Sequence, residues 1–473
     1  MALGAVWLAG CTSLQTAPAV ALPTVQVPAA WAGLAPASPS SSSAAPVSLA
    51  AQWWHVLGDA QLTALIDQAL QANSTVRTAL AALQQARAQV DVQAAGLLPS
   101  VAASGSAQRS RSSGATSNLF QAGLDAQWEV DLWGRLRAGL SAAQWDALAA
   151  QASLGDAQVS LAAEVALAYI ELRSVQQRLA IARSNLASQS ETLQLARWRL
   201  QAGLTTSLVV EQARSAAEQT AAQVPALEAS QAKQRHALAV LTGQAPAALD
   251  APLGAEGAIP SPGTELALDI PAQTLRQRAD VRAAEHRISA ALARVAQADA
   301  ARYPSFNLSG SLGLRALTLG SLTSAGAGTG ALLAGLSIPL LDGGAARAQV
   351  RSQEAALEQA RVAYEAAVLA ALQDVEDALA ALQGDRDRLV RLRAAADAAA
   401  NAALLAQQRY ASGLIDFQTV LETQRTQLTT QDAVVTTQAA VATDHVRLVK
   451  ALGGGWQAAA TEPSARTGRA AQE

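Results

Sequence analysis

The chain has 473 residues, of which 51% are hydrophobic, 15% charged and 3% aromatic, and this profile favours long helices packed through small side chains. The formal net charge of −3 offers no basic surface for a phosphate backbone, so nucleic acid is not expected as a partner. Cys11 is the single cysteine and no two of the four histidines are spaced i,i+4. This excludes a disulfide within the chain, and neither a metal site nor a cofactor is expected.

The first eleven residues have the pattern of a leader that ends at a cysteine. Residues 1–10 are expected to be a signal peptide, and Leu8-Ala9-Gly10-Cys11 resembles the bacterial lipobox, in which the cysteine is lipidated. We therefore expect Cys11 to be a lipid anchor, residues 11–58 to be an extended lipid-anchored segment, and Thr12 to permit sorting to the outer membrane. The alternative is a signal-peptide core that merely contains a cysteine. No lysine or arginine precedes the apolar run, although a secretory leader normally has one, so the true start site is left open.

The rest of the chain consists of two related halves, expected at 59–243 and 271–453. The run from Arg199 to Leu204 returns as the run from Arg409 to Leu414, and Pro99-Ser100 returns as Pro304-Ser305. Two long repeats indicate a duplicated domain, because a solenoid needs many short ones. Residues 244–270, rich in proline and glycine, are expected to be a linker, and residues 454–473 a flexible tail.

Each half is expected to begin with a helix, at about 59–97 and 271–301, and to continue with two strands. Apolar and polar residues alternate without a gap from Phe120 to Leu132, and a similar alternation follows Pro304. A period of two gives a strand one greasy face and one polar face. The strands are predicted at about 99–131 in the first half and about 303–341 in the second.

Very long helices follow the strands. No proline occurs from residue 132 to 224 or from residue 340 to 462, and the stretch 368–389 has apolar residues at alternating steps of four and three, as in a coiled-coil seam. A helix of about 65 residues reaches roughly 100 Å. Each helical stretch is expected to fold back where glycine ends it, at Gly203-Leu204 and at Gly413-Leu414.

The strands must account for any membrane crossing. No run of about 18 apolar residues follows the leader, which a spanning helix would need. Four strands cannot close a barrel, because both edges would leave unpaired backbone groups in lipid. Several chains are therefore required, and the periodicity alone does not choose between two chains with eight strands and three chains with twelve.

The order of these elements resembles the TolC-type outer-membrane factors, and within them the lipoprotein branch of NodT and OprM type. The segments that carry the resemblance include Trp128–Arg135, His236–Gly243, Ile338–Gly344 and Asp374–Leu379. The resemblance implies a mainly α fold with a small β part, assembled as a homotrimer with a twelve-stranded outer-membrane barrel on a twelve-helix tunnel across the periplasm. It also implies a passive channel for drugs or other small molecules, which is not an enzyme and works with a periplasmic adaptor (membrane-fusion protein) and an inner-membrane pump.

The resemblance also implies site residues. Gly203, Leu204, Gly413 and Leu414 are expected at the periplasmic tips that meet the adaptor, and Tyr410 and Glu422 fall on gate positions of the family. Thr419 stands where the family often has an acidic residue, and the first half offers Leu208 and Val209 instead of a polar pair. The gate is therefore expected to be more apolar here or to use Arg199, Arg409 and Asp416.

Two alternatives accompany this interpretation. One is the outer-membrane duct of a type I protein-secretion system, with the same fold and another inner-membrane partner. The other is a periplasmic coiled-coil scaffold without a pore, which would leave the greasy face of the strands unexplained. The sequence does not identify the cargo, the pump or the adaptor.

Overall fold

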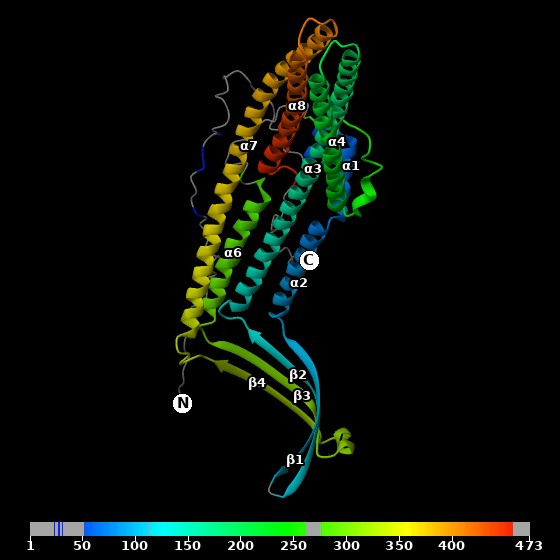
Figure 1. The fold of residues 1–473 in the computed structure, drawn as a ribbon. Coiled ribbons are helices and arrows are strands. Elements are labelled where there is room, and N and C mark those ends of the chain that lie inside the picture. The colour runs from blue at the N-terminus through cyan, green and yellow to red at the C-terminus, as the bar shows by residue number, and fades with distance from the viewer. Residues whose placement is uncertain are drawn as a thin grey trace, which may run out of the picture. The chain divides into compact units, whose positions relative to one another are not determined.

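The computed structural model describes residues 52–112, 114–261, 275 and 277–456, together with Pro23, Val27, Pro28 and Trp31 (Figure 1). The predicted leader and Cys11, most of the extended segment 11–58, part of the linker and most of the tail lie outside the described residues. The main helices are α1 (Ala60–Ala72), α2 (Ser74–Ala95), α3 (Arg135–Gln201), α4 (Ser207–Leu241), α6 (Ala279–Ala300), α7 (Ala345–Ala411) and α8 (Phe417–Ala451). Short 3₁₀ helices are η1 (Trp53–Leu57), η2 (Pro246–Leu249) and η3 (Leu319–Thr323).

The chain divides into two compact units. Unit 1 contains residues 1–24, 90–146 and 285–365, and unit 2 contains residues 25–89, 147–284 and 366–473. Helices α2, α3, α6 and α7 each have residues in both units. The fold is mainly helical with one small sheet, as the sequence predicts.

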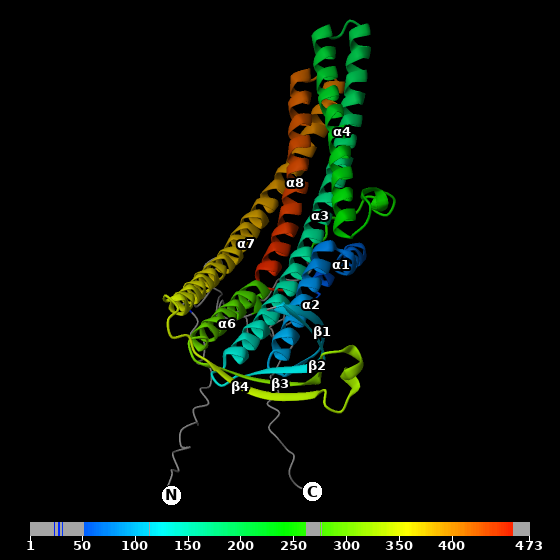
Figure 2. The ribbon, with the colours of Figure 1, turned by 90° about the horizontal axis from the view of Figure 1, so that it is seen from below.

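The described residues of unit 1 hold one four-stranded antiparallel sheet in the order β1-β2-β3-β4 (Figure 1). The strands are β1 (Ser100–Ser112), β2 (Ala115–Val130), β3 (Ser305–Ala316) and β4 (Gly328–Ser337). Within the ranges that the structure describes, β1 and β4 each pair on one side only, so the sheet has two open edges. Figure 2 shows the strands side by side in this order.

The two faces of the sheet differ in polarity because cross-strand partners point to the same side. On one face Leu124 pairs with Leu312, Trp128 with Leu308, and Phe306 with Leu336. The neighbouring positions on the other face carry polar partners, such as Asp125 opposite Ser311 and Glu129 opposite Asn307. Several leucines of the apolar face, namely Leu124, Leu312, Leu332 and Leu336, are more than half exposed in one chain.

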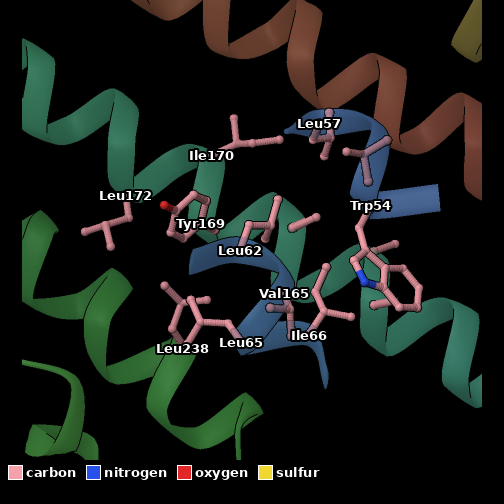
Figure 3. Packing of buried hydrophobic residues seen from close by; sticks show 14 of the residues in the cluster. Trp54, Leu57, Leu62, Leu65, Ile66, Val165, Tyr169, Ile170, Leu172 and Leu238 are labelled. Atoms are coloured by element: carbon pink, nitrogen blue, oxygen red, sulfur yellow. The ribbon is translucent and has the colours of Figure 1, made fainter. Parts of the chain in front are cut away.

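Unit 2 contains the main hydrophobic core (Figure 3). Side chains of η1, α1, α3 and α4 meet there, among them Trp54, Leu62, Ile66, Tyr169 and Leu238. The hydroxyl of Tyr169 donates to Asp59 Oδ2 at 2.8 Å, and Arg173 donates to the Tyr169 hydroxyl at 2.9 Å. Arg173 also donates to the carbonyl oxygen of Ala255 at 2.8 Å, so a buried polar network holds part of the linker on the core.

The helix expected over 59–97 is two helices, because the chain breaks at Asn73. Asn73 is extended (ψ 137°), and its side chain donates to the carbonyl oxygen of Leu241 at 2.8 Å while accepting from Thr75 N at 2.7 Å. A backbone break is stabilised here by partners that lie far away in the sequence. The helix expected over 271–301 is described as α6 from Ala279, and residues 271–274 and 276 lie outside the described residues.

The same junction recurs in the second half. There Arg278 donates to the carbonyl oxygen of Ala451 at 3.1 Å, as Asn73 does to Leu241. Gly243 and Gly453 follow the two carbonyl-bearing helix ends with φ of 72° and 79°, and a Cβ on either would press on the backbone of the partner segment. The duplication therefore extends to individual packing contacts.

Part of the predicted coiled-coil seam on α7 packs against a residue from the N-terminal segment. Trp31 lies buried in a cluster with Val375, Leu379 and Leu382 of α7 and with Leu448 of α8. The seam is thus shared between α8 and a tryptophan that precedes the repeats.

No helix in the described ranges combines the length and the apolar character needed to cross a membrane.

Candidate functional site

The turn between α3 and α4 is a Schellman motif centred on Gly203. Gly203 has φ 71°, and Leu204 N donates to the carbonyl oxygen of Arg199 at 2.8 Å while Gly203 N donates to that of Leu200 at 3.0 Å. This pattern satisfies the last carbonyls of a helix and requires a left-handed residue, which glycine adopts without strain. The first of the two expected tips is therefore a tight cap built by the backbone.

The turn between α7 and α8 repeats that geometry. Gly413 has φ 75°, and Leu414 N donates to the carbonyl oxygen of Arg409 at 2.9 Å while Gly413 N donates to that of Tyr410 at 2.9 Å. Asp416 then caps α8, because its Oδ1 accepts from the backbone N and the hydroxyl of Thr419 at 3.0 and 2.6 Å. The same hydrogen bonds, first that from the Thr419 hydroxyl, lower the pKa of Asp416.

The residue after each of these two glycines is a leucine with an exposed side chain. In a Schellman motif this position usually packs back onto the helix, but Leu204 is 71% exposed and Leu414 is 75% exposed. Both tips therefore present an exposed apolar side chain on a turn whose backbone is fixed by hydrogen bonds.

A small hydrophobic cluster beneath the turns joins the two hairpins. It contains Ala196, Ala213, Ala406, Tyr410, Phe417 and Val420. The rings of Tyr410 and Phe417 lie 5.4 Å apart. Because α3 and α4 contribute the first two alanines and α7 and α8 the rest, this tip cluster packs one hairpin against the other.

Arg199 and Tyr410 make the most specific contact at the tips. Arg199 Nη1 donates to the carbonyl oxygen of Tyr410 at 2.7 Å, and its guanidinium lies 4.6 Å from the centre of the Tyr410 ring. Tyr410 is only 5% exposed, and its hydroxyl has no hydrogen-bond partner among the described residues of the chain. The ring face and the backbone of Tyr410 therefore form this contact, and the hydroxyl takes no part in it.

The other expected gate residues do not join this contact within one chain. Glu422 lies exposed on α8, about one and a half helical turns beyond Phe417, and Arg409 is exposed on α7. Asp416 has the local task of capping α8. The structure of one chain thus brings together Arg199 and Tyr410, and places Glu422, Arg409 and Asp416 elsewhere on the surface.

Sequence reasoning missed a series of polar contacts between α3 and α8. Gln424 donates to Thr192 Oγ1 at 3.0 Å, Asn185 donates to Gln431 Oε1 at 3.0 Å, and Arg178 pairs with Asp432 at 2.6 Å. Asn185, Thr192 and Gln424 are buried. The α3 residues recur every seven positions, about two turns, and this was visible in the sequence, but their partners lie on a helix more than 200 residues away. These contacts hold the two hairpins together below the tip cluster.

Unit 2 also contains a cavity of about 430 Å³ beside Arg278. Several aspartates line it, but Arg278 pairs with Asp280 and Asp374 at 2.7 and 3.0 Å, and Arg447 pairs with Asp444 at 3.2 Å. The cavity is therefore largely neutralised by its own ion pairs. Among the described residues, no group of three or more histidine, cysteine, aspartate or glutamate side chains is placed to hold a metal ion.

Comparison with known proteins agrees with this architecture of a sheet and paired long hairpins. A family model described as outer membrane efflux protein matches residues 65–244 and 270–454. The chain belongs to this family of channel and efflux proteins. It is an outer-membrane channel protein of an efflux system, and its resemblance to the TolC-type factors is confirmed.

Particular relatives cover almost the whole chain. The outer membrane protein OprJ of Pseudomonas aeruginosa is 32% identical over 93% of this chain and 92% of its own length. Nodulation protein T of Rhizobium leguminosarum is 30% identical, over 89% and 87%. Among solved structures, the outer-membrane channel OprN is 34% identical with a TM-score of 0.83, over 92% of this chain and 99% of its own. VceC of Vibrio cholerae is 29% identical with a TM-score of 0.79, over 86% and 100%.

Proposed function

We propose that three copies of this chain form a passive exit duct, anchored in the outer membrane through a lipid on Cys11 and opened at the α3–α4 and α7–α8 tips. The observation that carries the proposal is the open-edged, two-faced sheet in a chain of this family. One sheet leaves the outward-facing backbone groups of its edge strands β1 and β4 unpaired, which is untenable in lipid. Pairing β4 of one copy with β1 of the next, three times over, gives twelve strands and no edge.

The tips are proposed to serve as docking surface and gate together. Leu204 and Leu414 would meet the helical hairpins of a periplasmic adaptor, which in turn connects to an inner-membrane pump. Arg199 and Tyr410 would hold the two hairpins of a chain together in the closed state, and three copies of Glu422 and Asp416 would add negative charge to the narrow end and favour cations there. Opening then requires the Arg199–Tyr410 contact to break.

The choice of cargo is proposed to lie with the pump. Relatives of similar distance are named for different cargoes: one at 31% identity for toluene efflux and one at 33% identity for pyoverdine export. The duct accordingly needs only width and a tolerant lining, and the chain itself catalyses no reaction.

The test is the native mass of the protein extracted from outer membranes in mild detergent, together with the mass of one chain. Three chains, each with an acyl-scale addition that is lost in the Cys11→Ser variant, are expected. Trimers without the addition would refute the anchor alone. A soluble, unmodified monomer or dimer would refute the duct and favour the periplasmic scaffold. A secretion duct would instead be revealed by loss of an exported protein on deletion of the gene, with small-molecule tolerance unchanged.

A further inference from the structure

The strand ends that adjoin the helices all lie at the same end of the sheet, along the strand direction. Ser100 at the start of β1 pairs with Gln127 near the end of β2, Val130 pairs with Phe306, and Ser305 pairs with Ser337 at the end of β4. Two of these ends lead into the long helices: residues 131–134 connect β2 to α3, and residues 338–344 connect β4 to α7. We call these segments the two joints.

Each joint exposes a pair of large apolar side chains. Leu132 and Trp133 are about half exposed in the first joint, and Leu340 and Leu341 are 89% and 95% exposed in the second. Trp133 stacks on Tyr303 at 5.1 Å and donates from Nε1 to the carbonyl oxygen of Pro304 at 2.8 Å. These groups follow the strands at the helix end of the sheet, and Trp133 and Tyr303 have the amphipathic character of residues at a membrane–water boundary.

An acidic cap makes each joint rigid. Asp131 accepts from the backbone N of Leu136 and of Arg137 at 3.1 and 2.9 Å, and Asp342 accepts from the backbone N of Gly344 and of Ala346 at 2.8 Å each. The two carboxylates therefore satisfy the first amides of α3 and α7. Asp131 also pairs with Arg137 of α3 at 3.1 Å, and the positive charge of Arg347 on α7 contributes to the lowered pKa of Asp342.

Two arginines follow the second cap, and among the described residues no carboxylate lies within ion-pair distance of either. Arg347 and Arg351 are exposed and lie one turn apart on α7, hence on the same side of the helix. In the described part of the chain neither forms an ion pair. Other arginines near the helix end of the sheet do form ion pairs: Arg135 with Glu129, Arg137 with Asp131, and Arg302 with Asp299. Arg347 and Arg351 thus follow the two nearly fully exposed leucines by six to eleven residues along the chain.

We propose that the joints form a collar that binds anionic phospholipid in the leaflet on the helix side of the membrane. Leu132, Trp133, Leu340 and Leu341 would enter the acyl boundary, and Arg347 and Arg351 would bind the headgroup phosphates. The inference rests on the proposed function, since it takes the apolar face of the sheet to lie in lipid. Charge complementarity selects the occupant: each chain has two exposed guanidiniums outside ion-pair distance of any described carboxylate. Each can bind a phosphate in bidentate fashion, which favours an anionic headgroup over a zwitterionic one.

The experiment is native mass spectrometry of the detergent-extracted protein titrated with phosphatidylglycerol or with phosphatidylethanolamine of the same acyl chains. The wild type is expected to bind phosphatidylglycerol more tightly. Each cationic group near an anionic lipid contributes roughly a fivefold effect, so Arg347→Gln/Arg351→Gln is expected to weaken phosphatidylglycerol binding roughly tenfold or more and to leave phosphatidylethanolamine binding unchanged.

Two further variants separate charge from apolar contact. Arg391→Gln/Arg393→Gln removes two exposed arginines from the same helix, about 60 Å further along it at 1.5 Å per residue, and should bind both lipids as the wild type does. Leu340→Ser/Leu341→Ser should weaken binding of both lipids. Equal binding of the two lipids by the wild type, or an undiminished preference in Arg347→Gln/Arg351→Gln, would overturn the proposal.

The same mass spectra distinguish failure of the proposed duct from failure of the lipid-binding collar. If the protein is not a membrane-extracted trimer, the proposed function fails and takes the collar with it. If the trimer is intact and shows no preference for phosphatidylglycerol, the duct stands and the collar alone is refuted.

Discussion

Arg199 and Tyr410 lie 211 positions apart on different helical hairpins, and the guanidinium of Arg199 covers the tyrosine ring while donating to its carbonyl oxygen at 2.7 Å. The contact uses the parts of tyrosine that phenylalanine shares. The hydroxyl of Tyr410 is buried without a partner, and an unsatisfied buried hydroxyl costs about 1–3 kcal/mol.

Tyr410→Phe is therefore expected to leave the tip intact and to keep or raise thermal stability. Tyr410→Ala and Arg199→Ala should each loosen it, because the stacking and the charged hydrogen bond together contribute about 2 kcal/mol. Single-channel conductance in planar bilayers measures the effect: both alanine variants should conduct more than the wild type, and Arg199→Lys should fall between. An opened channel in Tyr410→Phe would show that the hydroxyl, through a neighbouring chain, holds the gate.

The two bare leucines of the tips supply a second prediction. Leu204→Asp and Leu414→Asp should fold and assemble as the wild type does, because neither side chain is packed in the chain. Binding to the purified cognate adaptor, followed by surface plasmon resonance, should fall at least tenfold in the double variant. Val390→Asp, which changes an exposed apolar residue on α7 well before the tip, is the matched control. Full adaptor binding by the double tip variant would rule out docking through these residues.

His445 predicts a pH dependence of stability. It is buried with neither ring nitrogen bonded, and burial followed by the positive charge of Arg386 lowers its pKa from 6.5 to about 4. Between these pH values the unfolded chain holds a proton that the folded chain lacks, so stability falls as the pH drops through this window, by roughly 3 kcal/mol per chain in total.

Charged neighbours modify this profile. Burial raises the pKa of Asp444, and the negative charge of Asp385 on α7 raises it further. The effect of Asp444 on the free energy of unfolding is therefore opposite to that of His445, because ionisation of Asp444 lowers the stability as the pH rises above 3.8. Arg447 pairs with Asp444 and partly offsets that effect. Urea unfolding of the wild type and of His445→Phe from pH 4.5 to 7.5 isolates the contribution of the histidine. The free energy of unfolding of the wild type, relative to that of His445→Phe, should fall steadily from pH 6.5 to pH 4.5 and be constant above pH 7. A constant difference over the whole range would contradict the assignment.

Gly155 and Trp456 form a coupled pair. A Cβ on Gly155 would overlap the indole of Trp456, so Gly155→Ala must push the indole off α3 and away from Arg282, whose guanidinium lies 5.3 Å from the indole ring centre. We expect Gly155→Ala to cost about 1–2 kcal/mol in the wild type and almost nothing when Trp456→Ala is already present. Additive effects in this double-mutant cycle, measured by thermal unfolding, would show that the indole is not seated there.

The local features of the fold could be predicted from the sequence, and the long-range ones could not. Gly203 and Gly413 predict helix ends because only a residue that tolerates positive φ suits a Schellman cap, and alternation from Phe120 predicts β2 because side chains of a strand alternate between its faces. Asn73, by contrast, breaks a helix through a carbonyl group on Leu241, and nothing near Asn73 in the sequence indicates that partner.

The candidate site divides along the same line. Tyr410, Arg199 and the tip glycines could be selected from motifs, but the contact between Arg199 and Tyr410 depends on how two hairpins pack. The joints were overlooked for a related reason. In the sequence, Leu340 and Leu341 follow directly on the apolar pattern of the predicted strand. Only the structure shows that β4 ends at Ser337 and that both leucine side chains are exposed.

The two halves have diverged in sequence but not in length: α3 and α7 each have 67 residues, and α4 and α8 each have 35. An insertion in one half alone would displace its turn by 1.5 Å per residue relative to the other and would separate Arg199 from Tyr410. The lengths of the two hairpins must therefore change together. Insertions or deletions in these hairpins should survive in evolution only as matched pairs, one in each half at the same distance from its glycine.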